Sequence, residues 1–146
     1  MIRLFSPELR IIRTMLIKEF GSASPLLDQI ASLEFDIRHM TGTGYFVHFT
    51  NAEQLVRIDK LNTELSEDLH TSLDEPADLV AFTLFIRDGF LSSFEGYTFG
   101  DVGWPTEPME NWLVFNEHRE RFAPRELFSM GRRRSAIFDY TFSEAA

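Results

Sequence analysis

The residues with the clearest chemical promise surround Glu95. This carboxylate follows a strongly apolar stretch and precedes Gly96 and Tyr97, so we expect it to lie half buried beside aromatic rings. Apolar surroundings favour the protonated form of a carboxyl group, which is the property of a general acid or base. Tyr97, Trp104 and His48 complete a candidate pocket that would hold a small ligand or a partner's side chain.

Two structural interpretations compete with this pocket. Glu95 would accept hydrogen bonds from backbone N–H groups of its own glycine-containing loop, and the aromatic rings would belong to the core. Catalysis by an acid also needs a nucleophile or a partner base, and no motif supplies one near Glu95. The sequence therefore favours a protein that is not an enzyme, with no catalytic residue assigned.

Metal and anion sites are poorly supported. His39 and His48 lie on segments expected to pair, and could share a metal with Asp36 or Glu34. However, no HxH, HxxxH or HExxH spacing is present, and the Gly42–Gly44 stretch leads into a strand rather than a helix N-terminus. The chain has no cysteine, which excludes disulfides and thiolate chemistry. We predict neither a metal nor a cofactor.

The middle of the chain is strongly acidic. Residues 62–118 hold 1 Lys or Arg and 12 Asp or Glu, in a chain with a net charge of −9. Such a segment repels phosphate, which argues against nucleic acid, and attracts a cationic protein. The candidate interaction surface comprises Glu64, Glu67, Asp68, Asp74, Glu75 and Asp78. The alternative is that these acids only keep an aromatic-rich protein soluble. The basic run 132–134 is expected to form a solvated surface, or to pair with the chain's own acidic segment or a neighbouring subunit.

Length and composition predict one globular domain over residues 1–146. The chain is 44% hydrophobic and 25% charged, which excludes disordered, collagen-like and membrane-spanning classes. The N-terminal residues lack a long apolar segment and a small-residue cleavage site. We therefore expect a cytoplasmic protein without a membrane partner.

The first elements alternate between helix and strand. Ser6 as N-cap and Pro7 begin an amphipathic helix that ends at Gly21, and a short turn or helix follows Ser24. From Leu33 the apolar period becomes two, which predicts a strand that forms a hairpin with residues 45–49. This alternation places His39 on the inner face with Leu33, Phe35 and Ile37. Residues 51–61 fit either a short helix or a strand and favour a strand-and-loop segment, and residues 62–75 predict a weak helix or a mobile loop.

Asp88 and Gly89 give the clearest signal for a hairpin turn in the sequence. They separate two apolar runs, and both suit the positive φ of a two-residue type I′ hairpin. This turn pairs Arg87 with Phe90, Ile86 with Leu91 and Phe85 with Ser92. One face then collects Phe82, Leu84, Ile86, Leu91 and Ser93, and the other Thr83, Phe85, Phe90 and Phe94. Because both faces are largely apolar, we expect the N-terminal helix on one and C-terminal segments or a second subunit on the other.

The later residues complete an α+β fold. An irregular aromatic loop follows Glu95, a strand is expected at 111–115, a short helix at 125–130 and an edge strand or docking tail at 136–142. The predicted architecture is an N-terminal amphipathic helix packed on an antiparallel sheet of β-hairpins, with a short C-terminal helix.

Residues 82–105 resemble a motif of small uncharacterised bacterial proteins. In that motif a strand and an Asp-Gly turn precede Leu-Glu-Gly-Tyr-Thr-Tyr-Gly and then Trp-Pro; here Phe94 and Phe99 replace the leucine and the second tyrosine. The resemblance implies a bacterial cytoplasmic origin and a hairpin at this place, and no activity.

Two functions follow as hypotheses. The first is a non-enzymatic protein that binds another protein, as an immunity-type inhibitor does, or associates with itself as a homodimer. The second is a small-ligand-binding or enzymatic domain centred on Glu95.

Overall fold

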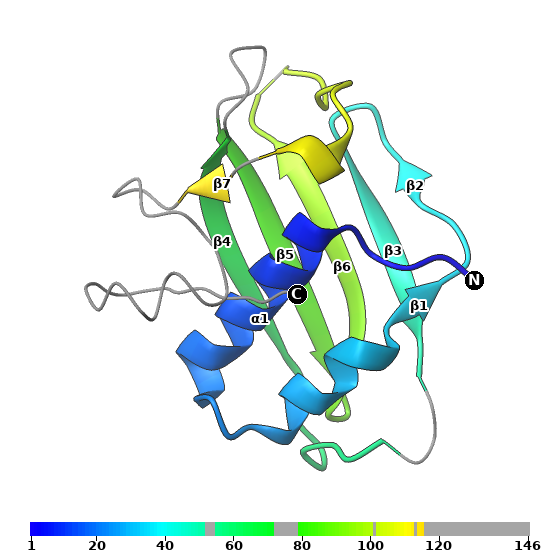
Figure 1. The fold of residues 1–146 in the computed structure, drawn as a ribbon, viewed down its shortest axis with the longest axis vertical. Helices are drawn as coiled ribbons and strands as arrows, with labels where there is room; N and C mark the ends of the chain where they lie inside the picture. The colour runs from blue at the N-terminus through cyan, green and yellow to red at the C-terminus, as the bar shows by residue number, and fades with distance from the viewer. Residues whose placement is uncertain (52–54, 72–78, 101, 113, 116–146) are drawn as a thin grey trace.

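The structure is a computed structural model that describes residues 1–51, 55–71, 79–100, 102–112, 114 and 115. One antiparallel sheet forms the back of the molecule in Figure 1, and the helices lie in front of it. The helical elements are α1 (Ser6–Phe20) and the 3-10 helices η1 (Pro25–Ser32) and η2 (Met109–Asn111). This arrangement confirms the predicted α+β class, with an N-terminal helix packed on an antiparallel sheet.

Seven described strands form the sheet in the order β1-β3-β6-β5-β4-β7, with β2 also paired to β3. Every pair is antiparallel. The strands are β1 (Glu34–Phe35), β2 (His39–Met40), β3 (Gly44–Thr50), β4 (Thr63–Thr71), β5 (Leu79–Arg87), β6 (Phe90–Thr98) and β7 (Val114–Phe115). In the described part of the chain, no helix is long and apolar enough to cross a membrane.

Helix α1 begins one residue earlier than its sequence signal indicates. The N-cap is Phe5, not Ser6, because the Glu8 carboxylate reaches back and accepts the Phe5 backbone N–H at 2.7 Å. The predicted end at Gly21 is confirmed, with φ of 88° at that residue. The face of α1 toward the sheet is fully buried, with Ile11, Ile12 and Leu16 at 0% exposure.

Strand β4 stands in place of the first part of the helix or loop predicted for residues 62–75; residues 72–75 lie outside the described residues. Leu65 and Leu69 are four residues apart, which also puts them on one side of a strand, and there they face α1. Eight successive residues of β4 pair with β5, so long-range pairing decides between two local interpretations. Residues 55–61 form a loop without helix or strand, so the loop part of the prediction for residues 51–61 is confirmed and the strand part is wrong for these described residues.

The Asp88-Gly89 hairpin is confirmed, with positive φ of 51° and 79° at its two turn residues. The predicted pairs of Arg87 with Phe90 and Ile86 with Leu91 are present, but Phe85 lies opposite Ser93 rather than Ser92. Ser92 is therefore an extra residue in β6, which moves every later residue to the opposite face. Two predicted positions are consequently wrong: Phe94 lies on the helix side and Ser93 on the other.

The first hairpin is shorter than its alternating sequence predicts. β1 pairs with the end of β3 and β2 with its start, and the chain between them leaves the sheet. Ile37 in this break is 55% exposed rather than inward-facing. The break resets the alternation, so His39 lies opposite Phe46, away from α1, and not on the inner face as predicted.

The C-terminal elements are only partly within the described residues. The strand predicted at 111–115 is β7, two residues long and paired with the end of β4. The helix predicted at 125–130, the strand at 136–142 and the basic run 132–134 lie outside the described residues.

Candidate functional site

The sheet has one face covered by the described helices and one that they leave uncovered. Along β5, Val80, Phe82 and Leu84 point toward α1 and are fully buried, so the alternate residues point the other way. α1, η1 and η2 all lie on one side of the sheet in Figure 1. We call the other side the open face; from β3 to β4 it carries Phe46, His48, Ser93, Glu95, Tyr97, Thr83, Phe85, Glu64, Ser66 and Asp68.

Glu95 lies near the middle of the open face. Phe46 of β3 is directly opposite on one side and Thr83 of β5 on the other, and the Glu95 side chain is half buried between them. Among the described residues, the Glu95 carboxylate has no hydrogen-bond or ion-pair partner. The predicted alternative, in which backbone N–H groups of its own loop bind it, is therefore absent from the described structure. Even the neighbouring Thr83 hydroxyl is paired elsewhere, with Ser66 at 3.0 Å.

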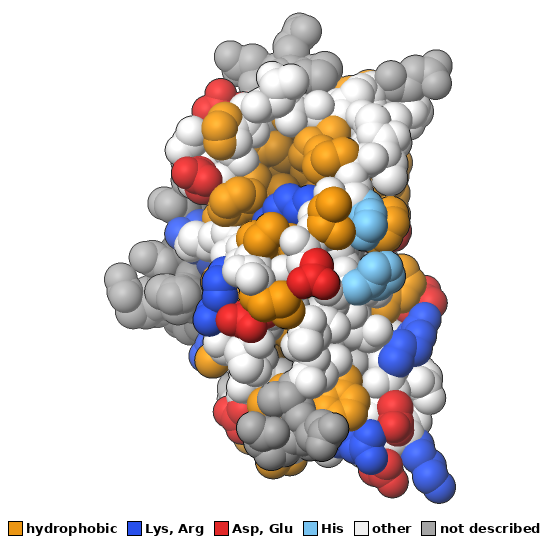
Figure 2. Space-filling model, turned by 90° about the vertical axis from the view of Figure 1, so that its right-hand side faces the viewer, with side chains coloured by type: hydrophobic (Ala, Val, Ile, Leu, Met, Phe, Trp, Pro, Cys, Tyr) orange, Lys and Arg blue, Asp and Glu red, His pale blue; other side chains and the backbone are white. Residues whose placement is uncertain are grey.

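Two of the residues predicted to join Glu95 do share its face. Tyr97 follows two positions along β6 and contacts Phe99 edge to face, with ring centroids 5.9 Å apart. His48 packs against Phe46 at 5.3 Å between centroids. Figure 2, which looks onto the edge of the sheet at β2 and β3, shows two histidine side chains next to each other among apolar ones.

Trp104, the fourth predicted pocket residue, lies on the helix side of the sheet. Its ring covers Gly96, where a Cβ atom on that residue would come within 2.9 Å of the ring, and it contacts Tyr45 at 5.3 Å between centroids. It also packs at 5.3 Å against Trp112, which is a core residue. The structure thus brings Glu95, Tyr97 and His48 to one face and separates Trp104 from them.

The acidic residues predicted to bind a partner divide in the same way. Glu64 and Asp68 lie on the open face of β4 and are exposed, whereas Glu67 faces α1 and binds Lys18 at 3.0 Å. Glu64 forms a solvent-exposed pair with Arg87 at 3.2 Å, and Asp68 has no partner among the described residues. Asp74, Glu75 and Asp78 lie outside the described residues. The open face therefore combines aromatic rings, one half-buried carboxylate and an acidic rim.

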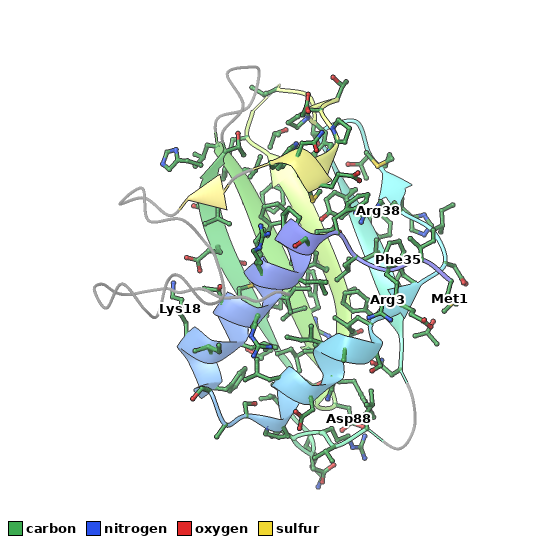
Figure 3. The ribbon with its side chains drawn as sticks, in the orientation of Figure 1. Met1, Arg3, Lys18, Phe35, Arg38 and Asp88 are labelled. Atoms are coloured by element: carbon green, nitrogen blue, oxygen red, sulfur yellow. The ribbon has the colours of Figure 1, made fainter. Side chains whose placement is uncertain are left out.

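Nothing in the sequence predicts a second polar cluster, which lies around Glu8. Glu8, at 0% exposure, binds Arg38 through two hydrogen bonds of 2.5 and 2.6 Å, and it also accepts the hydroxyl of buried Tyr45. Arg38 lies over the rings of Phe5 and Phe35 at 4.5 and 5.1 Å (Figure 3). The only signal for this cluster in the sequence is an acidic residue in the first turn of a helix, which predicts no partner.

The electrostatics of this cluster indicate a structural role. Burial raises the pKa of Tyr45 well above its ordinary value of 10.0, and the adjacent Glu8 carboxylate raises it further. Burial also opposes the charge of Arg38, but the Glu8 carboxylate outweighs this effect and raises the pKa of Arg38. Each carboxylate oxygen of Glu8 is thus satisfied within the protein, which leaves no position for a ligand.

The described residues contain no group of three or more His, Cys, Asp and Glu that could hold a metal ion. Comparisons with protein-family models, with curated proteins and with solved structures gave no match to this chain.

Proposed function

We propose that this protein acts by binding another protein through its open face, and that the partner presents a lysine or arginine to Glu95. The observation that carries the proposal is the unpartnered, half-buried Glu95 carboxylate between Phe46 and Thr83. A carboxylate partly removed from water without a partner is unfavourable, and an incoming cation would relieve that cost.

The neighbours of Glu95 suit the same kind of side chain. Phe46 and Tyr97 are aromatic and flank the carboxylate across and along the sheet, where they would contact the stem and the charged end of an arginine. Glu64 and Asp68 extend the negative potential to β4, which would speed the encounter with a basic partner. Aromatic residues at the centre of an interface often dominate its binding energy, and the rim around them is polar.

Charge favours a basic protein over a second copy of this chain. Two open faces brought together would oppose their carboxylates, which disfavours a homodimer through this face. The small-ligand alternative loses support because Trp104 lies on the other side of the sheet. We therefore propose a non-enzymatic binding protein of the immunity type; its bacterial and cytoplasmic setting stays a prediction.

Affinity capture from the source cells tests this proposal. Wild-type protein and a Glu95→Gln variant would be compared at two salt concentrations, with Glu110→Gln as matched control because Glu110 is exposed at η2 on the helix side. We expect a basic partner that both wild type and control retain and that Glu95→Gln loses. With the purified partner, Kd should rise more than tenfold, because truncating one side of a buried charge pair costs about 2–5 kcal/mol.

Charge reversal at the rim supplies an independent check. Asp68→Lys should slow association and flatten its dependence on salt, since Asp68 contributes to long-range attraction. Partner binding that is indifferent to Glu95→Gln, to Asp68→Lys and to salt would contradict the proposal.

A further inference from the structure

The outer edge of β4 is a second surface with binding potential. β5 pairs with one edge of β4 from Thr63 to His70, whereas β7 pairs with the other edge only at His70 and Thr71. In the part of the chain that the structure describes, no strand lies beside the outer edge at residues 64–68. Along that edge every second residue directs its backbone N–H and C=O outward, which is the template for adding a strand.

A hollow of about 260 Å³ lies between this edge and the last turns of α1. Met15 and Leu65 form its apolar part, and the ion pair of Lys18 with Glu67 borders it (Figure 3 labels Lys18). Side chains of an added strand alternate between the two sides of the sheet. Those on the helix side would enter this hollow, and those on the other side would meet the exposed acids Glu64 and Asp68.

We propose that this edge binds an extended, basic segment of a partner protein as an additional antiparallel strand. The direction follows from the sheet, in which all described pairs are antiparallel and β7 already pairs with β4 in that sense. The edge sets the pattern of the segment: a basic residue opposite Asp68, another opposite Glu64, and an apolar residue opposite Leu65 that fills the hollow.

A second copy of this chain fits the edge less well. An antiparallel pair of β4 strands centred on Ser66 would place Glu64 of one copy opposite Asp68 of the other. Like charges directly opposite each other destabilise a strand pair. A basic segment converts the same two positions into attractive contacts, so charge complementarity selects it.

This inference goes beyond the open-face function, because strand addition uses the backbone edge of β4 and needs no contact with Glu95. The two ideas can therefore fail separately. A suitable probe is the peptide acetyl-Thr-Lys-Thr-Thr-Val-Lys-Thr-amide, whose two lysines align with Asp68 and Glu64 and whose valine aligns with Leu65. Binding to the full chain would be followed by amide chemical shifts and by fluorescence anisotropy of a labelled copy.

Backbone methylation of the peptide separates strand addition from simple charge attraction. One peptide carries N-methyl groups at its even residues and another at its odd residues. Because only alternate peptide amides face β4, we expect one of the two to bind at least about tenfold more weakly and the other like the parent. Shift changes should centre on residues 63–69, Asp68→Lys should weaken binding about fivefold, which is the scale of an exposed charge pair, and Glu95→Gln should leave it unchanged.

Several results would overturn the inference. Equal binding of both methylated peptides would mean that side-chain charge alone holds the peptide. Shift changes centred on Phe46 and Tyr97 would assign the peptide to the open face and leave the proposed function standing. An absence of binding would mean that the edge does not accept such segments, and sedimentation would then show whether a second copy of the chain occupies it.

Discussion

Replacing Arg38 by methionine is expected to destabilise the fold by about 3–5 kcal/mol, because it leaves the buried Glu8 carboxylate without its counter-charge. Arg38 supplies two of the hydrogen bonds to Glu8, at 2.5 and 2.6 Å, and it is the cation paired with Glu8 among the described residues. Methionine keeps an apolar stem against Phe5 and Phe35, so the loss of folding stability measures the ionic contribution separately from packing.

An exposed ion pair of the same protein gives the reference for the destabilisation expected from Arg38→Met. Glu8 has no exposed surface and Arg38 exposes 19% of its side chain, whereas Arg87 and Glu64 expose 46% and 56%. Exposed pairs contribute about 0–1 kcal/mol, because water and salt screen them. Arg87→Met is therefore the matched control, and its expected cost lies below about 1 kcal/mol apart from lost contact with Phe85.

Urea denaturation followed by circular dichroism measures both variants, with the m-value as a check that the unfolded state is unchanged. A cycle with Glu8→Leu completes the design: the double variant should be markedly more stable than the sum of the single losses predicts, since no unpaired charge remains buried. A cost for Arg38→Met that matches the Arg87→Met control, or additive losses in the cycle, would refute this reasoning.

Two further variants probe the buried polar contacts. The raised pKa of Tyr45 means that the folded state favours the neutral side chain. The contribution of Tyr45 to the free energy of unfolding is therefore complete below about pH 10, and it declines as the pH rises from there toward the folded pKa. Unfolding free energies from pH 8 to 11 should thus fall more steeply for wild type than for Tyr45→Phe; parallel curves would contradict the assignment. Gln29 is fully buried and bonds the carbonyls of Val56 and Gly89 and the N–H of Leu91 at 2.9–3.0 Å. Gln29→Leu should cost about 2–4 kcal/mol in the same urea assay, and a loss below about 1 kcal/mol would mean that water replaces the amide.

Elements with strong local signals could be predicted from the sequence. Glycine at the end of α1 and Asp88-Gly89 between β5 and β6 require backbone conformations that few other residues adopt, and both have positive φ in the structure. The fold class follows from these elements, because an amphipathic helix and apolar hairpins can bury their faces only against each other.

Features that depend on distant partners could not be predicted. β4 looks locally like a weak helix, and its pairing with β5 decides its conformation. Arg38 and Tyr45 are 30 and 37 residues from Glu8, so no spacing rule connects them. Likewise, no local sequence pattern reveals that the Glu95 carboxylate has no partner among the described residues.

One extra residue in β6 explains why the predicted pocket divides. Without the bulge at Ser92, Glu95 would lie on the helix side, where Tyr45 and Trp104 lie. The bulge instead turns Gly96 toward the core, where the absent side chain makes room for the Trp104 ring, and turns Glu95 to the open face. The same shift buries Phe94 against Phe82 at 5.5 Å between ring centroids. Core packing and the position of the unpartnered carboxylate therefore depend on the same single register change in β6.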